Sequence, residues 1–203
     1  MAQGKWISWT PHKKKYDWLM FGLIVLYLAV FSVSHLSLYP ATLPPTLIIK
    51  ATGTLAIFML HIILIMGPLV RLDQRFLPLL YNRRHVGVTM FVISLIHGVF
   101  SLFFYHGSGV VNPVSSLFTS NIHYDSFSRF PYMTLGFTAL LIFAAMAITS
   151  HDRWNNKLGA RGWKNLHMAV YLAYALVIIH VATGALQGDI NNLANWILYF
   201  GIG

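Results

Sequence analysis

The segment RRHVGVTMFVISLIHGVF, residues 83–100, decides the fold that we expect for this chain. It carries His85 and His97 and has no charged residue between them. A second segment, HMAVYLAYALVIIH at residues 167–180, also has no charge and begins and ends with a histidine. At a helical rise of about 1.5 Å per residue, the two histidines of each segment lie roughly 18–20 Å apart. Each segment therefore predicts a long apolar helix with an imidazole at two different depths.

The composition places these helices in a membrane. Mean hydropathy is +0.63, and hydrophobic residues make up 57% of the chain against 9% for charged residues. Such values are typical of integral membrane proteins and not of soluble domains. A membrane-spanning helix needs about 20 apolar residues, and long runs without Lys, Arg, Asp or Glu provide them. These runs are 18–49, 51–70, 86–124, 130–150 and 165–188.

We therefore predict an all-α fold, an integral membrane helical bundle of five transmembrane helices of the cytochrome b kind. The expected helices are 18–38, 49–70, 86–104, 131–149 and 165–185. A basic segment at 1–17 precedes the membrane domain, 18–188, and the tail at 189–203 is an outer-side piece or the start of a sixth helix. The segments 71–85 and 150–164 are expected as loops, and 105–130 as an ordered cap over the outer face.

The positive charges are distributed unequally between alternate loops. Twelve of the Lys and Arg residues lie in the N-terminal segment and in the loops 71–85 and 150–164, whereas the opposite loops hold only Lys50 and Arg129. The positive-inside rule then predicts a bacterial inner-membrane protein with a cytoplasmic N-terminus. Because topology and lipid headgroups account for the net charge of +9, we expect no nucleic-acid partner.

Several kinds of chemistry have no residues to support them. The chain has no cysteine, which excludes disulfides and thiolate-bound haem or iron–sulfur clusters. It has no glutamate and no aspartate inside an expected span, which argues against a proton pump or ion-coupled carrier. No GxGxxG motif follows a strand, so electrons would come from another protein or from quinol. No internal repeat is evident, and no cleavable signal precedes the first span.

Four histidines are candidate ligands of haem iron. The two segments run in the same direction through the membrane, which places His85 and His167 near the cytoplasmic boundary and His97 and His180 nearer the other face. Two axial imidazoles from facing helices are a common way for a helical bundle to hold a b-type haem. The spacing therefore predicts one or two haems b, with His97 paired to His180 and His167 paired to His85.

Other residues compete for these roles. Residues 12 or 13 apart on a helix differ by about 120–140° around its axis, and His85, next to two arginines, is the weaker candidate. His61 lies near mid-membrane and could replace His97 as a ligand, bond a haem propionate or only contact a neighbouring helix. Arg84 and Arg129 could pair with haem propionates, although positive residues at these places also serve as topology signals.

A series of short motifs runs in order through about residues 50–185. They are Thr52-Gly53, Pro68-Leu69-Val70-Arg71, Arg83-Arg84-His85-Val86-Gly87, His97, Arg129, Pro131-Tyr132, Thr134-Leu135-Gly136, Thr149-Ser150, Lys157-Leu158-Gly159, Trp163, Leu166-His167 and His180. In these motifs the chain resembles the ferric-reductase-like transmembrane family, most closely its small bacterial branch that serves methionine sulfoxide reduction. The resemblance implies haem ligation by His97, His167 and His180. It also implies electron transfer from a cytoplasmic flavin reductase or from quinol to a periplasmic redox protein.

Alternatives remain for the function. The chain could be a quinol-oxidising, or a metal- or oxygen-reducing, haem subunit of a larger complex. FMN or a quinone could be a further carrier beside a single haem. A haem-free structural membrane subunit is the alternative of another class. In each alternative in which the chain binds haem, it is an electron-transfer subunit without a substrate-converting site of its own.

Overall fold

The structure is a computed structural model that describes residues 11–125 and 129–187. The chain divides into two units, residues 1–41 and 42–203, which are described separately. All regular structure in the described residues is helical, so the predicted all-α membrane bundle is confirmed. The expected tail at 189–203 lies outside the described residues, as do most of the residues expected to precede the first span.

The first unit contains one long helix, α1 (Pro11–Leu38). Proline is favoured in the first turn of a helix, and the lysines that follow are good helix formers, so α1 begins before the expected residue 18. Its apolar side chains, Trp18 and Leu26 among them, are exposed along most of its length. The ring of His35 stacks on Phe31 at 5.6 Å between ring centres and contacts Tyr39.

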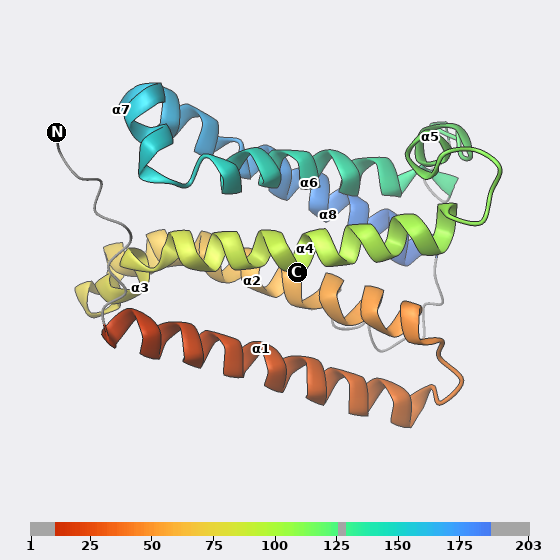
Figure 1. Ribbon diagram of the computed structural model, residues 1–203, viewed down its shortest axis with the longest axis horizontal. Coiled ribbons are helices and arrows are strands. Elements are labelled where there is room, and N and C mark those ends of the chain that lie inside the picture. Colours follow the sequence, from red (N-terminus) through yellow and green to blue (C-terminus); the bar gives the residue numbers. More distant parts are fainter. Residues whose placement is uncertain (1–10, 126–128, 188–203) are drawn as a thin grey trace, which may run out of the picture. The chain divides into compact units, whose positions relative to one another are not determined.

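The second unit is built from two pairs of long helices. The first pair is α2 (Pro44–Leu72) with α4 (Arg83–His106), and the second is α6 (Tyr132–Ile148) with α8 (Val170–Gln187). The helices of each pair pack against each other, and contacts between α4 and α6 join the pairs (Figure 1). Each corresponds to an expected span: α4 and α6 begin and end within three residues of the prediction, whereas α2 begins five residues earlier and α8 five residues later.

Short helices fill the connections. Between α2 and α4 lie η1 (Gln74–Phe76) and α3 (Leu77–Tyr81). The side chain of Asp73 caps η1 by accepting a hydrogen bond of 2.8 Å from the main-chain N–H of Arg75. Within the expected outer loop, Asn112 caps α5 (Pro113–Thr119) in the same way.

The expectation of a loop at 150–164 is wrong, because this segment is the helix α7 (Asp152–Met168). Its many charged residues suggested a loop, but charge also suits an amphipathic helix at a membrane surface. His151 caps α7 by accepting a hydrogen bond from the N–H of Arg153. The helix is kinked at Gly159, whose φ of 67° is the left-handed conformation that glycine adopts without strain.

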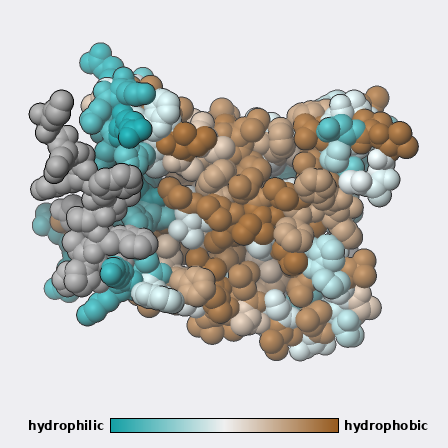
Figure 2. All heavy atoms as spheres, viewed as in Figure 1, coloured by the Kyte–Doolittle hydropathy of each residue, from teal (hydrophilic) through white to brown (hydrophobic). Residues whose placement is uncertain are grey.

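Four helical stretches are long and apolar enough to cross a membrane: Lys14–Leu38, Pro44–Leu72, Arg83–His106 and Asp152–Gly184. The remaining expected span corresponds to α6, which has 17 residues and a length of about 26 Å. Figure 2 shows hydrophilic residues gathered over α7 and hydrophobic residues along α4 and α6. Exposed apolar side chains such as Val92, Phe103 and Leu141 suit contact with lipid.

Candidate functional site

Two of the predicted ligands, His97 of α4 and His180 of α8, face each other across the second unit. Their ring centres are 6.3 Å apart, and the ring planes are nearly perpendicular at 81°. Two imidazoles on opposite sides of one metal ion, each bonded at about 2 Å, bring their ring centres to about 6 Å. The observed separation therefore fits a single iron atom between the two rings.

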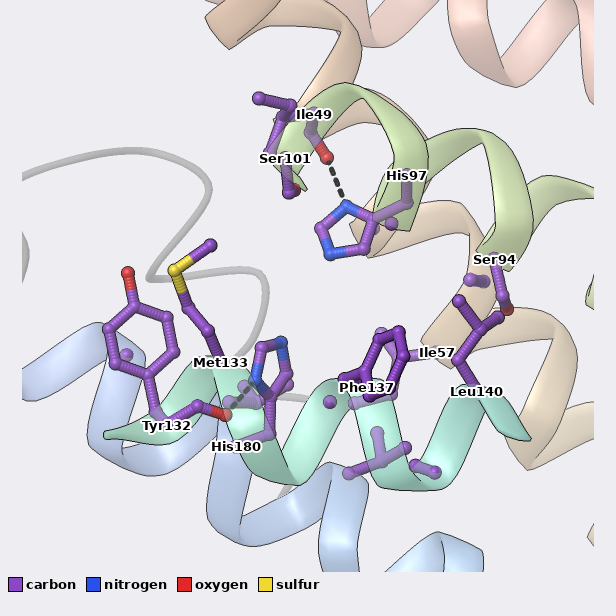
Figure 3. Close-up of a pocket in the computed structure, with 18 of the residues that line it drawn as sticks. Ile49, Ile57, Ser94, His97, Ser101, Tyr132, Met133, Phe137, Leu140 and His180 are labelled. Atoms are coloured by element: carbon purple, nitrogen blue, oxygen red, sulfur yellow. Dashed lines mark hydrogen bonds between the residues drawn. The ribbon is translucent and has the colours of Figure 1, made fainter. Parts of the chain in front are cut away.

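Both rings are oriented by a main-chain carbonyl of a neighbouring helix. Nδ1 of His97 lies 2.9 Å from the carbonyl oxygen of Ile49 in α2, and Nδ1 of His180 lies 2.8 Å from that of Tyr132 in α6. A carbonyl only accepts hydrogen bonds, so each Nδ1 carries the proton and each Nε2 keeps its lone pair. Figure 3 shows the two Nε2 atoms directed into the space between the rings. This is the tautomer that metal-ligating histidines adopt.

A glycine makes each of these close contacts possible. A Cβ atom on Gly53 of α2 would stand 2.8 Å from Nδ1 and Cε1 of His97, and a Cβ on Gly136 of α6 would stand at the same distance from the same atoms of His180. Real side chains essentially never approach so closely, so each ring occupies space that only glycine leaves open. The carbonyl that holds each ring belongs to the residue one helical turn before the glycine.

The two half-sites are built to one plan. The histidine follows its carbonyl partner by 48 residues in both cases. Corresponding residues lie 83 apart in the chain (180 − 97 for the histidines, 136 − 53 for the glycines). The helix pair α2 and α4 therefore corresponds to the pair α6 and α8. This internal repeat was missed in the sequence because few residues besides the glycines and histidines are shared.

The two rings line a cavity of about 260 Å³, here called the first cavity. Most of its lining is apolar, and Thr54, Ser94 and Ser101 add hydroxyl groups. Lys50, Tyr105 and Tyr132 line it as well, all three near the ends of their helices on the side where α5 lies. An apolar cavity with two convergent imidazoles and a cation at its edge suits a flat, largely apolar group that carries carboxylates.

A second cavity of about 380 Å³ lies toward the other end of the same helices. Arg83, Arg84 and Lys164 line it, so we call this the basic end. His167 lines it too, with its ring stacked on Trp163 at 3.8 Å between centres and its Nδ1 3.0 Å from the Trp163 carbonyl oxygen. Its Nε2 is buried and makes no hydrogen bond among the described residues, although the main chain of Met146 also acts on this imidazole.

A thin wall separates the two cavities. Leu60 of α2, Met90 of α4 and Phe143 of α6 line both of them, and all three are buried. Leu60 and Phe143 are again corresponding residues of the two helix pairs, 83 residues apart (143 − 60). The repeat thus extends from the first cavity to the second.

Residues 52–178, well over half of the chain, match the family described as "Ferric reductase like transmembrane component". The chain belongs to this family. The resemblance seen in the sequence is therefore confirmed, and the two cavities lie among the helices that the match covers.

Several curated relatives carry the name "Protein-methionine-sulfoxide reductase heme-binding subunit MsrQ". The protein from Herminiimonas arsenicoxydans is 31% identical over 137 residues, which cover 68% of this chain and 58% of that protein. Those from Cronobacter sakazakii and Bordetella pertussis are 34% and 32% identical, covering 64% and 68% of this chain and 59% and 61% of theirs. The chain thus spans about three fifths of the relatives it matches. No solved structure matches it significantly.

In this ferric-reductase-like chain, the other predicted site residues lie apart from the facing pair. His85 is exposed and lines neither cavity, because the 12-residue spacing turns it away from the face of α4 that carries His97. His61 also lines neither cavity. Its Nδ1 lies 2.8 Å from the carbonyl oxygen of Ile57, and the hydroxyl of Tyr174 lies 3.2 Å from its Nε2.

The two predicted arginines differ in position. Arg84 lines the second cavity, forms an ion pair with Asp152 and lies over the ring of Trp163 at 5.2 Å. Arg129 is exposed and lines neither described cavity, and its carbonyl accepts a hydrogen bond from Asn121. Among the described residues, Lys50 is the cation at the first cavity, whereas its position in the sequence indicated only a topology signal.

Proposed function

We propose that this chain is a membrane electron-transfer protein that binds haem b in the first cavity through His97 and His180. The observation that carries the proposal is the facing pair itself, with ring centres 6.3 Å apart and both Nδ1 atoms engaged by carbonyls. The curated relatives, whose name includes haem binding, support it. Bound haem supplies reversible one-electron chemistry.

The residues of the first cavity prepare it for that chemistry. The carbonyls of Ile49 and Tyr132 fix the two rings before any group binds, so little ordering is required on binding. Two neutral imidazoles and an apolar lining set the redox potential of a group held between them. Lys50 at the edge of the cavity supplies a positive charge for a propionate.

We propose that the second cavity holds a second haem through His167. Its ring lines the cavity and its Nε2 makes no hydrogen bond among the described residues, so a small turn of the ring would present Nε2 to iron, and Arg84 and Lys164 are suited to propionates. The wall of Leu60, Met90 and Phe143 is only one layer of side chains thick. Two haems in these cavities would therefore form a short path along the helices. FMN or quinone in place of the second haem is the alternative.

The charge distribution supports a direction for this path. Positive residues favour the cytoplasmic side, so we propose that the basic end faces the cytoplasm of a bacterial inner membrane. A flavin reductase or quinol would give electrons at this end, and a periplasmic redox protein would accept them at the other. The name of the relatives points to methionine sulfoxide reduction as the process served.

The test is a haem determination on the full chain purified in detergent. We expect a reduced-minus-oxidised spectrum of the b type, and a pyridine haemochrome count of one to two haems per chain. His97→Ala and His180→Ala should each remove the haem of the first cavity, whereas His123→Ala, an exposed histidine, should leave the count unchanged. A colourless protein, or full haem content in both variants, would favour a haem-free structural subunit instead.

A further inference from the structure

We propose that the second cavity binds its haem through one protein ligand only, His167, and that the opposite face of that haem takes a small external ligand such as carbon monoxide or imidazole. This inference rests on the proposed function and extends it. It distinguishes the two haems by their chemistry: the first is closed between two histidines, and the second is open on one side.

The internal repeat carries the first step of the argument. The residue that corresponds to His180 is His97, and the residue that corresponds to His167 is Arg84, since 167 − 84 is again 83. Both members of this second pair line the second cavity. The internal repeat that contributes two imidazoles to the first cavity therefore contributes an imidazole and a guanidinium to the second.

Arg84 cannot complete the coordination of an iron atom. A guanidinium stays protonated and has no lone pair to offer a metal. The group is also engaged, by the ion pair with Asp152 and by the ring of Trp163 at 5.2 Å. The residue that corresponds to His167 thus supplies a positive charge beside Trp163, and it supplies no second ligand.

The other lining residues of α2 and α4 are poor ligands as well. Helices α2 and α4 contribute Leu60, Ile63, Gly87 and Met90 to the lining, together with the two arginines. Among the described side chains, His167 is the only histidine that lines this cavity, and the chain has no cysteine. His85, the partner predicted from the sequence, is exposed and outside the lining.

Met90 is the one sulfur donor from α2 or α4, and its position is already determined. Its Sδ lies 3.3 Å from the hydroxyl of Ser94, and its side chain is buried in the wall between the cavities. Gly87, one turn before it, faces open space, because a Cβ atom built there would meet nothing within 4 Å. This side of the cavity therefore has room for a small molecule and no strong ligand to compete with it.

The class of ligand follows from the surroundings. The space beside Gly87, next to the apolar side chains of Leu60, Ile63 and Met90, favours small, neutral molecules that bind iron directly, such as carbon monoxide with the ferrous form and imidazole with the ferric form. In the first cavity the same molecules would have to displace an imidazole held by a carbonyl. The two haems should therefore differ in ligand binding even where their absorption bands overlap.

The experiment is a carbon monoxide titration of the dithionite-reduced full chain, together with electron paramagnetic resonance of the ferric form. We expect carbon monoxide to bind about half of the haem in the wild type, and a high-spin ferric signal beside a low-spin one. His167→Ala should lose the high-spin signal and all carbon monoxide binding while keeping one low-spin haem. His85→Ala, the control, should retain both haems and their ligand binding.

A second variant avoids removing any ligand. Gly87→Leu should fill the open side, so that carbon monoxide binding falls at least tenfold while haem content is retained. Gly22→Leu, at an exposed glycine of α1 with nothing within 4 Å of its added Cβ, is the matched control. These variants report on the open face without requiring that the chain tolerate loss of His167.

Several results would overturn the inference. Two haems that are both low-spin and inert to carbon monoxide would mean that the protein supplies a sixth ligand, and conversion to high spin in Met90→Leu would identify it. A single haem in the wild type that is unaffected by His167→Ala would show that the second cavity holds none. Neither result would contradict haem binding at His97 and His180, whereas the absence of any haem would contradict the proposed function itself.

Discussion

Gly136 and His180 are in such close contact that a single methyl group would separate them: a Cβ atom on Gly136 would lie 2.8 Å from Nδ1 and Cε1 of the imidazole. Gly53 and His97 repeat this relationship in the other helix pair. The ring cannot retreat freely, because its Nδ1 is also bonded to a carbonyl on the same helix as the glycine. The glycine thus fixes how deeply the ring lies against the helix, and with it the position of Nε2.

We expect Gly136→Ala and Gly53→Ala to reduce haem occupancy of the first cavity at least tenfold. The displaced imidazole would lose its carbonyl partner, and its Nε2 would no longer point to the position of the iron. The pyridine haemochrome count on purified protein measures this. Gly67→Ala in α2 is the control. Gly67 lines neither cavity, and a Cβ atom built there would meet nothing within 4 Å. Equal haem content in all three variants would show that the close contacts do not position the rings.

Gly159 is required for a different reason, namely the backbone conformation at the kink of α7. Its φ of 67° and ψ of 162° lie in a region that side-chain-bearing residues avoid. We expect Gly159→Ala to destabilise the protein by about 1–3 kcal/mol, the usual cost of such a conformation. Thermal unfolding in detergent measures the change. Gly162→Ala in the same helix, where the new Cβ would make an ordinary 3.6 Å contact, should change stability far less.

The long helices could be predicted from the sequence, and their mutual orientation could not. The absence of charge over some 20 residues is a property of one segment, and so the bounds of α4 and α6 agree with expectation. Which face of a helix meets which neighbour depends on the other helices. The spacing of His85 and His97 already indicated that they point in different directions, and the structure shows that only His97 faces a cavity.

The depth of His167 could be predicted from the sequence, and its contacts could not. The helical stretch Asp152–Gly184 carries both His167 and His180 across the short break between α7 and α8, so the two histidines lie at different depths, as their spacing indicates. The stacking of His167 on Trp163 and the position of Arg84 over Trp163 depend on how the helices pack. The glycines were visible in the sequence as part of the family resemblance, but their contact with histidines far along the chain appears only when the helices pack.

We also predict that Arg84 tunes the potential of a haem in the second cavity. A nearby positive charge favours the reduced iron, which carries less charge, so Arg84→Gln should lower the midpoint potential of that haem by on the order of tens of millivolts. A redox titration followed by the optical spectrum measures it. Arg75→Gln should have no such effect, because Arg75 is almost fully exposed and pairs with Asp73 outside the cavity. A shift in the His97/His180 haem alone would contradict the placement of Arg84.

The hydrogen bond between Tyr174 and His61 joins α8 to α2. It gives the buried part of the His61 imidazole a partner, so no haem is needed to explain a histidine at this position. With Nδ1 near the carbonyl of Ile57 and Nε2 near the tyrosine hydroxyl, neither nitrogen of His61 is directed to a cavity. Tyr174→Phe removes one partner from a part-buried ring, and we expect a loss of stability of about 1 kcal/mol with unchanged haem content. Thermal unfolding and the haemochrome count on the same sample measure both. Loss of a haem in this variant would contradict this interpretation. It would show that haem binding depends on the orientation of the His61 imidazole.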